Sequence, residues 1–320
     1  MSSAYPAGIA AAQPLFRDPV YDGAADPVLL WHQTEQKWLL YYTNRRANVP
    51  GLAGFSWVHG TRIGVAESTD GGANWRYRGV ADIDYGAGDV SHWAPEVLWH
   101  AGRYHMYLSV VPGIHEDWSG QRFIVHLTSE DAFHWHYQST LPLVSDRVID
   151  ACVLRMPGGV WRLWYKDEVT NNSIWLAESD DLYTWRQAGQ VIGDHPGEGP
   201  KVFHFAGRYW MIVDQWRGIA VYHSPDGEAW TPQPRRILAT PGAGEDDQVM
   251  GGHADVVVSR ERAFCFYFTH PGRRGAGKDK DTTEQRRTSI QVVELTVSEG
   301  ELVAMRDEVT YVRLEPPTPG

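Results

Sequence analysis

The strongest constraint on the fold is a phrase that recurs five times, in which an ionisable residue introduces a short apolar run. The 320 residues give about 64 residues to each unit. A polar start at every copy is hard to explain by packing alone. It predicts that five first strands bring their polar ends to one pocket. The five phrases span Ala25–Leu29, Ala94–Leu98, Ile149–Val153, Glu198–Val202 and His253–Val257.

Each phrase is followed by a short turn and an apolar, aromatic run, and then by a third strand-like run. In four units a Ser/Asp-containing turn that closes on tryptophan comes next, and the fifth unit lacks it. Five units with three clear strands and room for a fourth predict an all-β chain folded as a five-bladed β-propeller with mostly four-stranded blades. We expect residues 1–320 to form a single catalytic domain. A β-sandwich is the competing architecture, but it does not require five-fold similarity. The aromatic runs are Lys37–Tyr42, Arg103–Leu108, Val160–Tyr165, Arg208–Val213 and Arg262–Tyr267.

The net charge and the composition limit the kinds of partner that the protein is expected to bind. The formal net charge is −11, which argues against binding to nucleic acid or to an anionic membrane. No run approaches the roughly 18 apolar residues of a membrane span, and the N-terminal segment lacks the pattern of a signal peptide. We therefore expect a cytoplasmic protein, and the oligomeric state is left open. Cys152 and Cys265 lie in apolar runs and are interpreted as buried free thiols.

Three carboxylic acids occur at equivalent or adjacent positions of the aligned repeat. Alignment of the units on their apolar cores puts Asp26, Asp150 and His253 at one strand position, with Glu198 one residue earlier and Glu96 two residues later. Hydrolysis of a glycosidic bond needs one ionised carboxylate and one protonated carboxylic acid. A third carboxylate can keep the acid protonated by like-charge repulsion. Asp26, Asp150 and Glu198 supply these groups.

The ordered motifs resemble glycoside hydrolase family 43, a family of five-bladed propellers. The resemblance rests on Ala25-Asp26-Pro27, Trp93-Ala94-Pro95-Glu96, Ile149-Asp150-Ala151, Glu198-Gly199-Pro200 and Gly252-His253-Ala254. It implies Asp26 as general base, Asp150 as pKa modulator and Glu198 as general acid, in a reaction that inverts the anomeric centre. It also implies a structural calcium ion near His253, bound through water, and no other cofactor. Glu96 stands where the family often has aspartate, and Ala254 where glycine often follows the histidine.

The function that the motifs predict is an exo-acting, inverting glycoside hydrolase that releases a terminal pentose, such as L-arabinofuranose or xylose. The partner is then a carbohydrate. Alternatives are a five-bladed glycosidase of another family, acting on anhydro-galactose or fructofuranosyl ends, and a carbohydrate-binding propeller without catalysis. For the tryptophans, core packing is the alternative to a sugar platform. The residues expected to contact substrate are Glu96, Trp93, His253, Asn44, Arg45 and Trp216.

Overall fold

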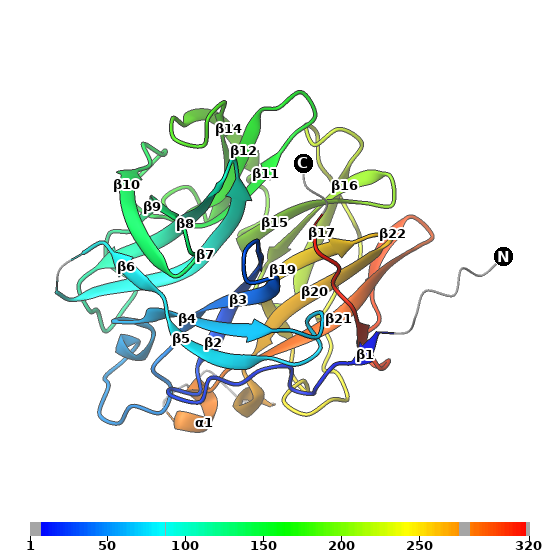
Figure 1. Cartoon of the computed structure of the whole chain (residues 1–320), viewed down its shortest axis with the longest axis horizontal. Coiled ribbons are helices and arrows are strands. Elements are labelled where there is room, and N and C mark those ends of the chain that lie inside the picture. The colour runs from blue at the N-terminus through cyan, green and yellow to red at the C-terminus, as the bar shows by residue number, and fades with distance from the viewer. Residues whose placement is uncertain (1–7, 87, 275–281, 318–320) are drawn as a thin grey trace.

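The computed structural model describes residues 8–86, 88–274 and 282–317. Five small antiparallel sheets are arranged in a ring (Figure 1). In each sheet the innermost strand contacts the innermost strands of the two neighbouring sheets, and the last sheet contacts the first. The predicted five-bladed β-propeller with mostly four-stranded blades is confirmed.

The blades follow one another along the chain, and each runs from the axis outward in chain order. The strands are, for blade I, β2(Ala24–His32), β3(Lys37–Asn44), β4(Arg62–Ser68) and β5(Arg76–Val80); for blade II, β7(Val90–His100), β8(Arg103–Pro112), β9(Phe123–Ser129) and β10(His134–Thr140); for blade III, β11(Val148–Arg155), β12(Trp161–Asp167), β13(Ser173–Ser179) and β14(Arg186–Ile192); for blade IV, β15(Glu198–Phe205), β16(Arg208–Asp214), β17(Ile219–Ser224) and β18(Thr231–Pro232); and for blade V, β19(Gly251–Ser259), β20(Arg262–Thr269), β21(Ser289–Ser298) and β22(Glu301–Ala304).

The remaining elements are short. Strand β6(Asp82–Asp84) pairs with β10 in parallel and adds a fifth strand to blade II. Strands β1(Ile9–Ala10) and β23(Tyr311–Val312) pair with each other and so join the two ends of the described chain. The helices are η1(Ser56–Val58), η2(Pro271–Arg273) and α1(Thr283–Arg286). No helix in the described ranges is long and apolar enough to cross a membrane.

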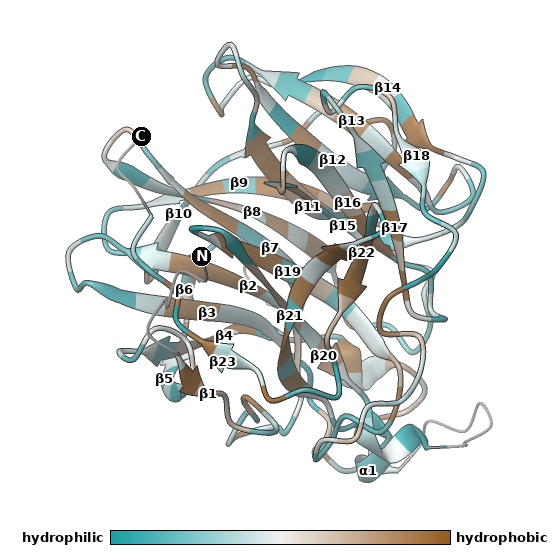
Figure 2. Cartoon of the chain, turned by 90° about the vertical axis from the view of Figure 1, so that its right-hand side faces the viewer, coloured by the Kyte–Doolittle hydropathy of each residue, from teal (hydrophilic) through white to brown (hydrophobic). Residues whose placement is uncertain are grey.

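The core is divided among the blade interfaces. One cluster of buried apolar side chains lies between each pair of neighbouring blades, including the pair formed by blades V and I. Hydrophobic segments accordingly recur along the strands of every blade (Figure 2). Burial of this apolar surface is the main force that holds the blades together. The ring in turn fixes the positions of the first strands around the axis.

The polar turns that follow the third strands have a structural role. Asp181 accepts hydrogen bonds from the backbone N–H groups of Tyr183 and Thr184, and Ser179 donates to the same carboxylate. The indole N–H of Trp185 donates to the carbonyl of Leu182 and so closes the turn. Equivalent Ser–Asp contacts occur in the other three turns. Cys152 and Cys265 are free and buried.

Candidate active site

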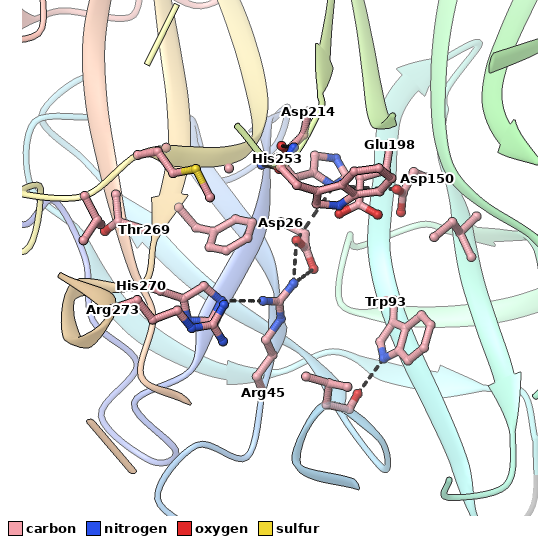
Figure 3. Close-up of a pocket in the computed structure, with 18 of the residues that line it drawn as sticks. Asp26, Arg45, Trp93, Asp150, Glu198, Asp214, His253, Thr269, His270 and Arg273 are labelled. Carbon is pink, nitrogen blue, oxygen red and sulfur yellow. Dashed lines mark hydrogen bonds and ion pairs between the residues drawn. The ribbon is translucent and has the colours of Figure 1, made fainter. Parts of the chain in front are cut away.

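A cavity of about 850 Å³ opens where the first strands of the blades begin. Its walls include residues of all five blades and of the loops that follow strands β3 and β20. Figure 3 shows Asp26, Asp150, Glu198, Asp214 and His253 gathered in one part of this cavity. The structure therefore brings the three predicted catalytic carboxyls together.

A shared backbone irregularity explains why these side chains meet. In all five first strands the pairing with the second strand shifts register at the site. Such bulges redirect side chains and are common next to active sites. Four of the five bulges contain a residue with positive φ, a conformation that is costly for non-glycine residues and that also occurs at active sites. These residues are Asp26 (51°), Ala94 (40°), Asp150 (60°) and Gly199 (57°).

The fourth-blade bulge needs glycine for a second reason. A Cβ atom at position 199 would lie 2.6 Å from Cγ of His253, closer than atoms can pack. Glu198 precedes this glycine and is brought toward the cavity from the start of β15. The alignment offsets predicted from the sequence therefore describe the bulges correctly, with Glu198 one residue before the bulge position.

Asp26 forms an ion pair. Nη2 of Arg45 donates to both carboxylate oxygens, at 3.0 and 3.2 Å. Nδ1 of His253 lies 3.8 Å from Oδ1 of Asp26. The guanidinium of Arg45 packs 4.7 Å from the ring centre of Phe268, which holds it in place. Asp26 is thus an oriented carboxylate at the cavity wall.

Asp150 is buried between two blades. Its Oδ2 accepts a hydrogen bond from the backbone N–H of Gly199 at 3.0 Å, and Nδ1 of His253 lies 4.0 Å from the same oxygen. Burial raises the pKa of Asp150 to about 6, and the negative charge of Glu198 adds to the effect while His253 opposes it. This carboxyl group takes up a proton more readily than an ordinary aspartate.

Glu198, the predicted general acid, has a positively charged neighbour that the sequence analysis did not anticipate. Burial pushes its pKa upward, but the ammonium of Lys166, 2.9 Å from Oε2, outweighs burial and leaves the pKa of Glu198 below its ordinary value. Lys166 comes from β12 and also donates to Glu168 at 3.3 Å. The like-charge repulsion predicted to raise the pKa of this group is thus overcome by a lysine that the sequence did not reveal.

Asp214 is a fourth carboxyl group that sequence reasoning missed. It ends β16, opposite Glu198 in the β15–β16 ladder. Its two oxygens accept backbone N–H groups of Trp216 at 2.7 Å and His253 at 2.9 Å. Burial, reinforced by the charge of Glu198, raises the pKa of Asp214 to about 7. The only available signal was a polar residue at the end of an apolar run.

Aromatic side chains line much of the remaining wall. Trp93 is buried at the cavity, and its indole N–H donates to the carbonyl of Val58 at 2.7 Å. Trp216 is 42% exposed, and the centre of its ring lies 5.3 Å from Nζ of Lys166. Phe55 and Trp118 also line the cavity, with ring centres 4.9 Å apart. These faces are placed where a sugar ring could stack.

Two predicted substrate contacts lie elsewhere. Asn44 does not line the cavity, because it is buried and its amide donates to Asp18 at 3.1 Å. Glu96 does not line the cavity either, and both of its oxygens contact Lys201 at 3.1 and 2.9 Å. The other predicted substrate contacts line the cavity, namely Trp93, Arg45, Trp216 and His253.

We call the buried group Glu96, Lys201 and Asp255 the axial clasp. Nζ of Lys201 is 2.8 Å from Oδ1 of Asp255, and Oδ2 of Asp255 accepts the N–H of Leu29. Oε1 of Glu96 accepts the N–H of Val153. Through these contacts the clasp joins the innermost strands of all five blades.

The calcium ion implied near His253 finds no direct ligand set. Across the described ranges, no three His, Cys, Asp or Glu side chains form a group that could hold a metal ion. The nearest carboxylates to Nδ1 of His253 are those of Asp26 and Asp150. Binding of calcium through water stays a prediction.

The fold and the site together define a class of protein. It is a five-bladed propeller whose axial cavity holds several carboxyl groups, an arrangement suited to acid–base chemistry on a small polar substrate. The sequence profile described as "Glycosyl hydrolases family 43" matches residues 55–299. The chain belongs to glycosyl hydrolase family 43, and it is a glycoside hydrolase. No curated protein matches it.

Solved structures share the fold. A GH43 β-xylosidase/α-arabinofuranosidase from a compost microbial metagenome is 15% identical, with a TM-score of 0.65, over 93% of this chain and 98% of that one. The GH43_1 enzyme from Xanthomonas citri, complexed with xylotriose, is 15% identical, with a TM-score of 0.66, over 96% and 97%. A GH43 β-1,3-galactosidase is 16% identical, with a TM-score of 0.68, over 94% and 100%. At these identities the likeness establishes the fold alone.

Proposed function

We propose that the protein is an exo-acting, inverting glycosidase that releases a terminal pentose such as L-arabinofuranose or xylose. The observation that carries this proposal is the arrival of Asp26, Asp150 and Glu198 at one cavity in three different electrostatic environments. Inverting hydrolysis needs a carboxylate base and a carboxylic acid that flank the bond, about 6.5–9.5 Å apart, so that water fits between base and sugar.

Asp26 is the base in this mechanism. Arg45 holds both of its oxygens, which fixes the carboxylate in orientation while it draws a proton from the attacking water. His253 lies close to both Asp26 and Asp150 and so fixes the positions of the two side chains relative to each other. As the water attacks the anomeric carbon, the bond to the leaving oxygen breaks on the opposite face of the sugar.

Glu198 is the acid that protonates the leaving oxygen. Lys166 favours its ionised form, so the proton must be supplied within the cavity. Asp150 and Asp214, with pKa values raised by burial to about 6 and about 7, are the carboxyls that keep protons near neutral pH. A sugar that fills the cavity also removes water from Glu198, which favours the protonated form. Interacting carboxyls of this kind titrate as a group.

The walls support exo action. Three inter-blade segments, around residues 45–60, 111–121 and 271–287, supply lining residues from their described parts, and residues 275–281 of the third segment lie outside the described ranges. The lining residues include Arg45, Trp57, Trp118 and Arg273. A walled cavity of about 850 Å³ suits the end of a sugar chain better than its middle.

A hexose is the second candidate for the released sugar, because a β-1,3-galactosidase is among the similar structures. A panel of aryl pentosides and aryl hexosides, each in both anomeric forms, tests the proposal. We expect kcat/KM to be highest for a pentoside. Faster release of a hexose would select the second candidate, and no turnover of any glycoside would contradict the proposed activity.

A further inference from the structure

One wall of the cavity is rich in arginine, although the chain as a whole has a formal charge of −11. Arg45, Arg273 and Arg274 line this wall, which we call the arginine wall, beside His270. Figure 3 shows Arg45, His270 and Arg273 grouped on the side of Asp26 that faces away from Glu198. Asp26 is the only carboxylate among the described residues that forms an ion pair with an arginine of this wall.

Arg45 is already engaged by the protein. Nη2 binds Asp26, and Nη1 lies 3.4 Å from Nε2 of His270. Nδ1 of His270 lies 3.1 Å from the carbonyl oxygen of Arg287, which can only accept, so Nδ1 carries the proton. Nε2 of a neutral His270 is then the acceptor for Arg45. The negative charge of Asp26 therefore neutralises the guanidinium of Arg45 and is not available to neutralise the guanidinium of Arg273.

Arg273 lacks such a balance. Nε donates to the carbonyl of Gln285 at 2.9 Å, which anchors the side chain. Within the described ranges no carboxylate forms an ion pair with Arg273, and no partner is found for its two terminal nitrogens. Burial, together with the positive charge of Arg45, lowers the pKa of Arg273 to about 9. A half-buried cation beside another cation is unfavourable unless an anion reaches it.

We propose that the arginine wall binds an anionic group on the sugar, a carboxylate of a uronic acid or a sulfate ester, with Arg273 as its principal donor. The planar guanidinium can place two N–H groups on two oxygens of either group. This inference rests on the proposed hydrolysis of a glycosidic bond, and it adds acidic, hexose-derived sugars to the pentose and the neutral hexose as candidates for the released sugar. It also separates the local charge of the cavity from the acidic charge of the whole chain.

A structural role is the simplest rival, since Arg273 ties η2 to α1 through Gln285. That role uses Nε alone and is satisfied by one hydrogen bond. It gives no reason for Arg273 to line the cavity. The two roles predict different ligand preferences, so binding measurements distinguish them.

The test measures binding of matched sugar pairs by calorimetry, with D-galacturonate against D-galactose, D-glucuronate against D-glucose, and galactose 6-sulfate against galactose. For at least one pair we expect the anionic sugar to bind about ten-fold or more tightly, the gain typical of a hydrogen bond to a charged group. The preference should decline at high salt. The carboxylate and sulfate arms identify which anion the wall prefers.

Variants then assign the preference to the wall. Arg273→Gln should reduce it to about two-fold or less, whereas Arg273→Lys, which keeps the charge but not the fork, should retain part of it. Arg186→Gln is the charge-matched control, because Arg186 is exposed on the outermost strand β14, and it should leave the preference unchanged. Thermal unfolding of each variant checks that it is folded.

The outcomes separate this inference from the proposed function. If no anionic sugar binds more tightly than its neutral counterpart, or if the preference persists in Arg273→Gln, the inference is overturned. Turnover of neutral pentosides without any anion preference would sink it while the glycosidase proposal stands. An Arg273-dependent preference without turnover would support the wall and contradict the proposed function alone.

Discussion

Replacement of Lys201 by methionine is the perturbation whose effect follows most directly from the structure. Nζ of Lys201 lies 2.8–3.1 Å from three carboxylate oxygens of Glu96 and Asp255. Glu96 and Asp255 are deeply buried, the side chain of Lys201 is 15% exposed, and the clasp contacts backbone groups in the two other blades. Lys201→Met keeps most of the side-chain volume and leaves two carboxylates facing each other without a cation.

Removal of one partner from a buried ion pair costs about 3–5 kcal/mol, because the remaining charge is left uncompensated. With two stranded carboxylates we expect the upper part of this range. Since a long chain loses about 2 °C of Tm per kcal/mol, the expected fall is roughly 8–10 °C. Urea and thermal unfolding measure both quantities. Glu96→Gln added to Lys201→Met should recover part of the loss, because only one carboxylate then lacks a cation.

Arg235→Met is the matched control. Arg235 pairs with Glu301 at 2.7 Å, but its side chain is 70% exposed. Exposed pairs contribute about 0–1 kcal/mol, so this variant should unfold close to the wild type. A loss below about 1 kcal/mol for Lys201→Met, comparable with the control, would refute the argument that the clasp holds the five blades together.

Three further predictions concern catalysis. Asp26→Asn removes the proposed base, so kcat/KM on aryl glycosides should fall about 10²–10⁴-fold; unchanged rates would reassign that role. Glu198→Gln should slow substrates with poor leaving groups about 10²-fold or more and those with activated aryl leaving groups far less, whereas an equal loss across a leaving-group series would count against Glu198 as the acid. In the wild type kcat/KM should decline as pH rises through about 6–7, where Asp150 and Asp214, whose pKa values are raised to about 6 and about 7, lose the protons that the reaction needs. Lys166→Met should move this decline to higher pH, since it removes the cation that lowers the pKa of Glu198, and an unmoved limb would contradict the assignment.

Much of the architecture could be predicted because each copy of the sequence repeat corresponds to one blade. Side chains at one offset in each phrase reach one level of the axis, so alignment of the phrases located Asp26, Asp150 and His253 correctly. The same alignment also contained evidence for the axial clasp that the sequence analysis did not use. Lys201 and Asp255 stand two residues after the bulge position, as Glu96 does, and opposite charges at one offset indicate a pair across the axis.

The electrostatics of the site could not be predicted in the same way. Lys166 and Asp214 lie at or near the ends of second strands, where the repeat has no constant residue type. Their approach to Glu198 depends on the pairing of strands within and between blades. For Asn44, the sequence offered no sign that Asp18 would bind its amide inside the protein instead of leaving it at the cavity. The charge state of Glu198 followed from such contacts and not from its motif.

The claim on which the account depends is that Asp26 and Glu198 act on opposite faces of one glycosidic bond. Proton NMR of the first sugar formed from an aryl glycoside tests it most directly, if spectra are taken before mutarotation. We predict that the first product has the anomeric configuration opposite to that of the substrate. A first product with retained configuration would contradict the account, because it requires a carboxylate that attacks carbon instead of activating water.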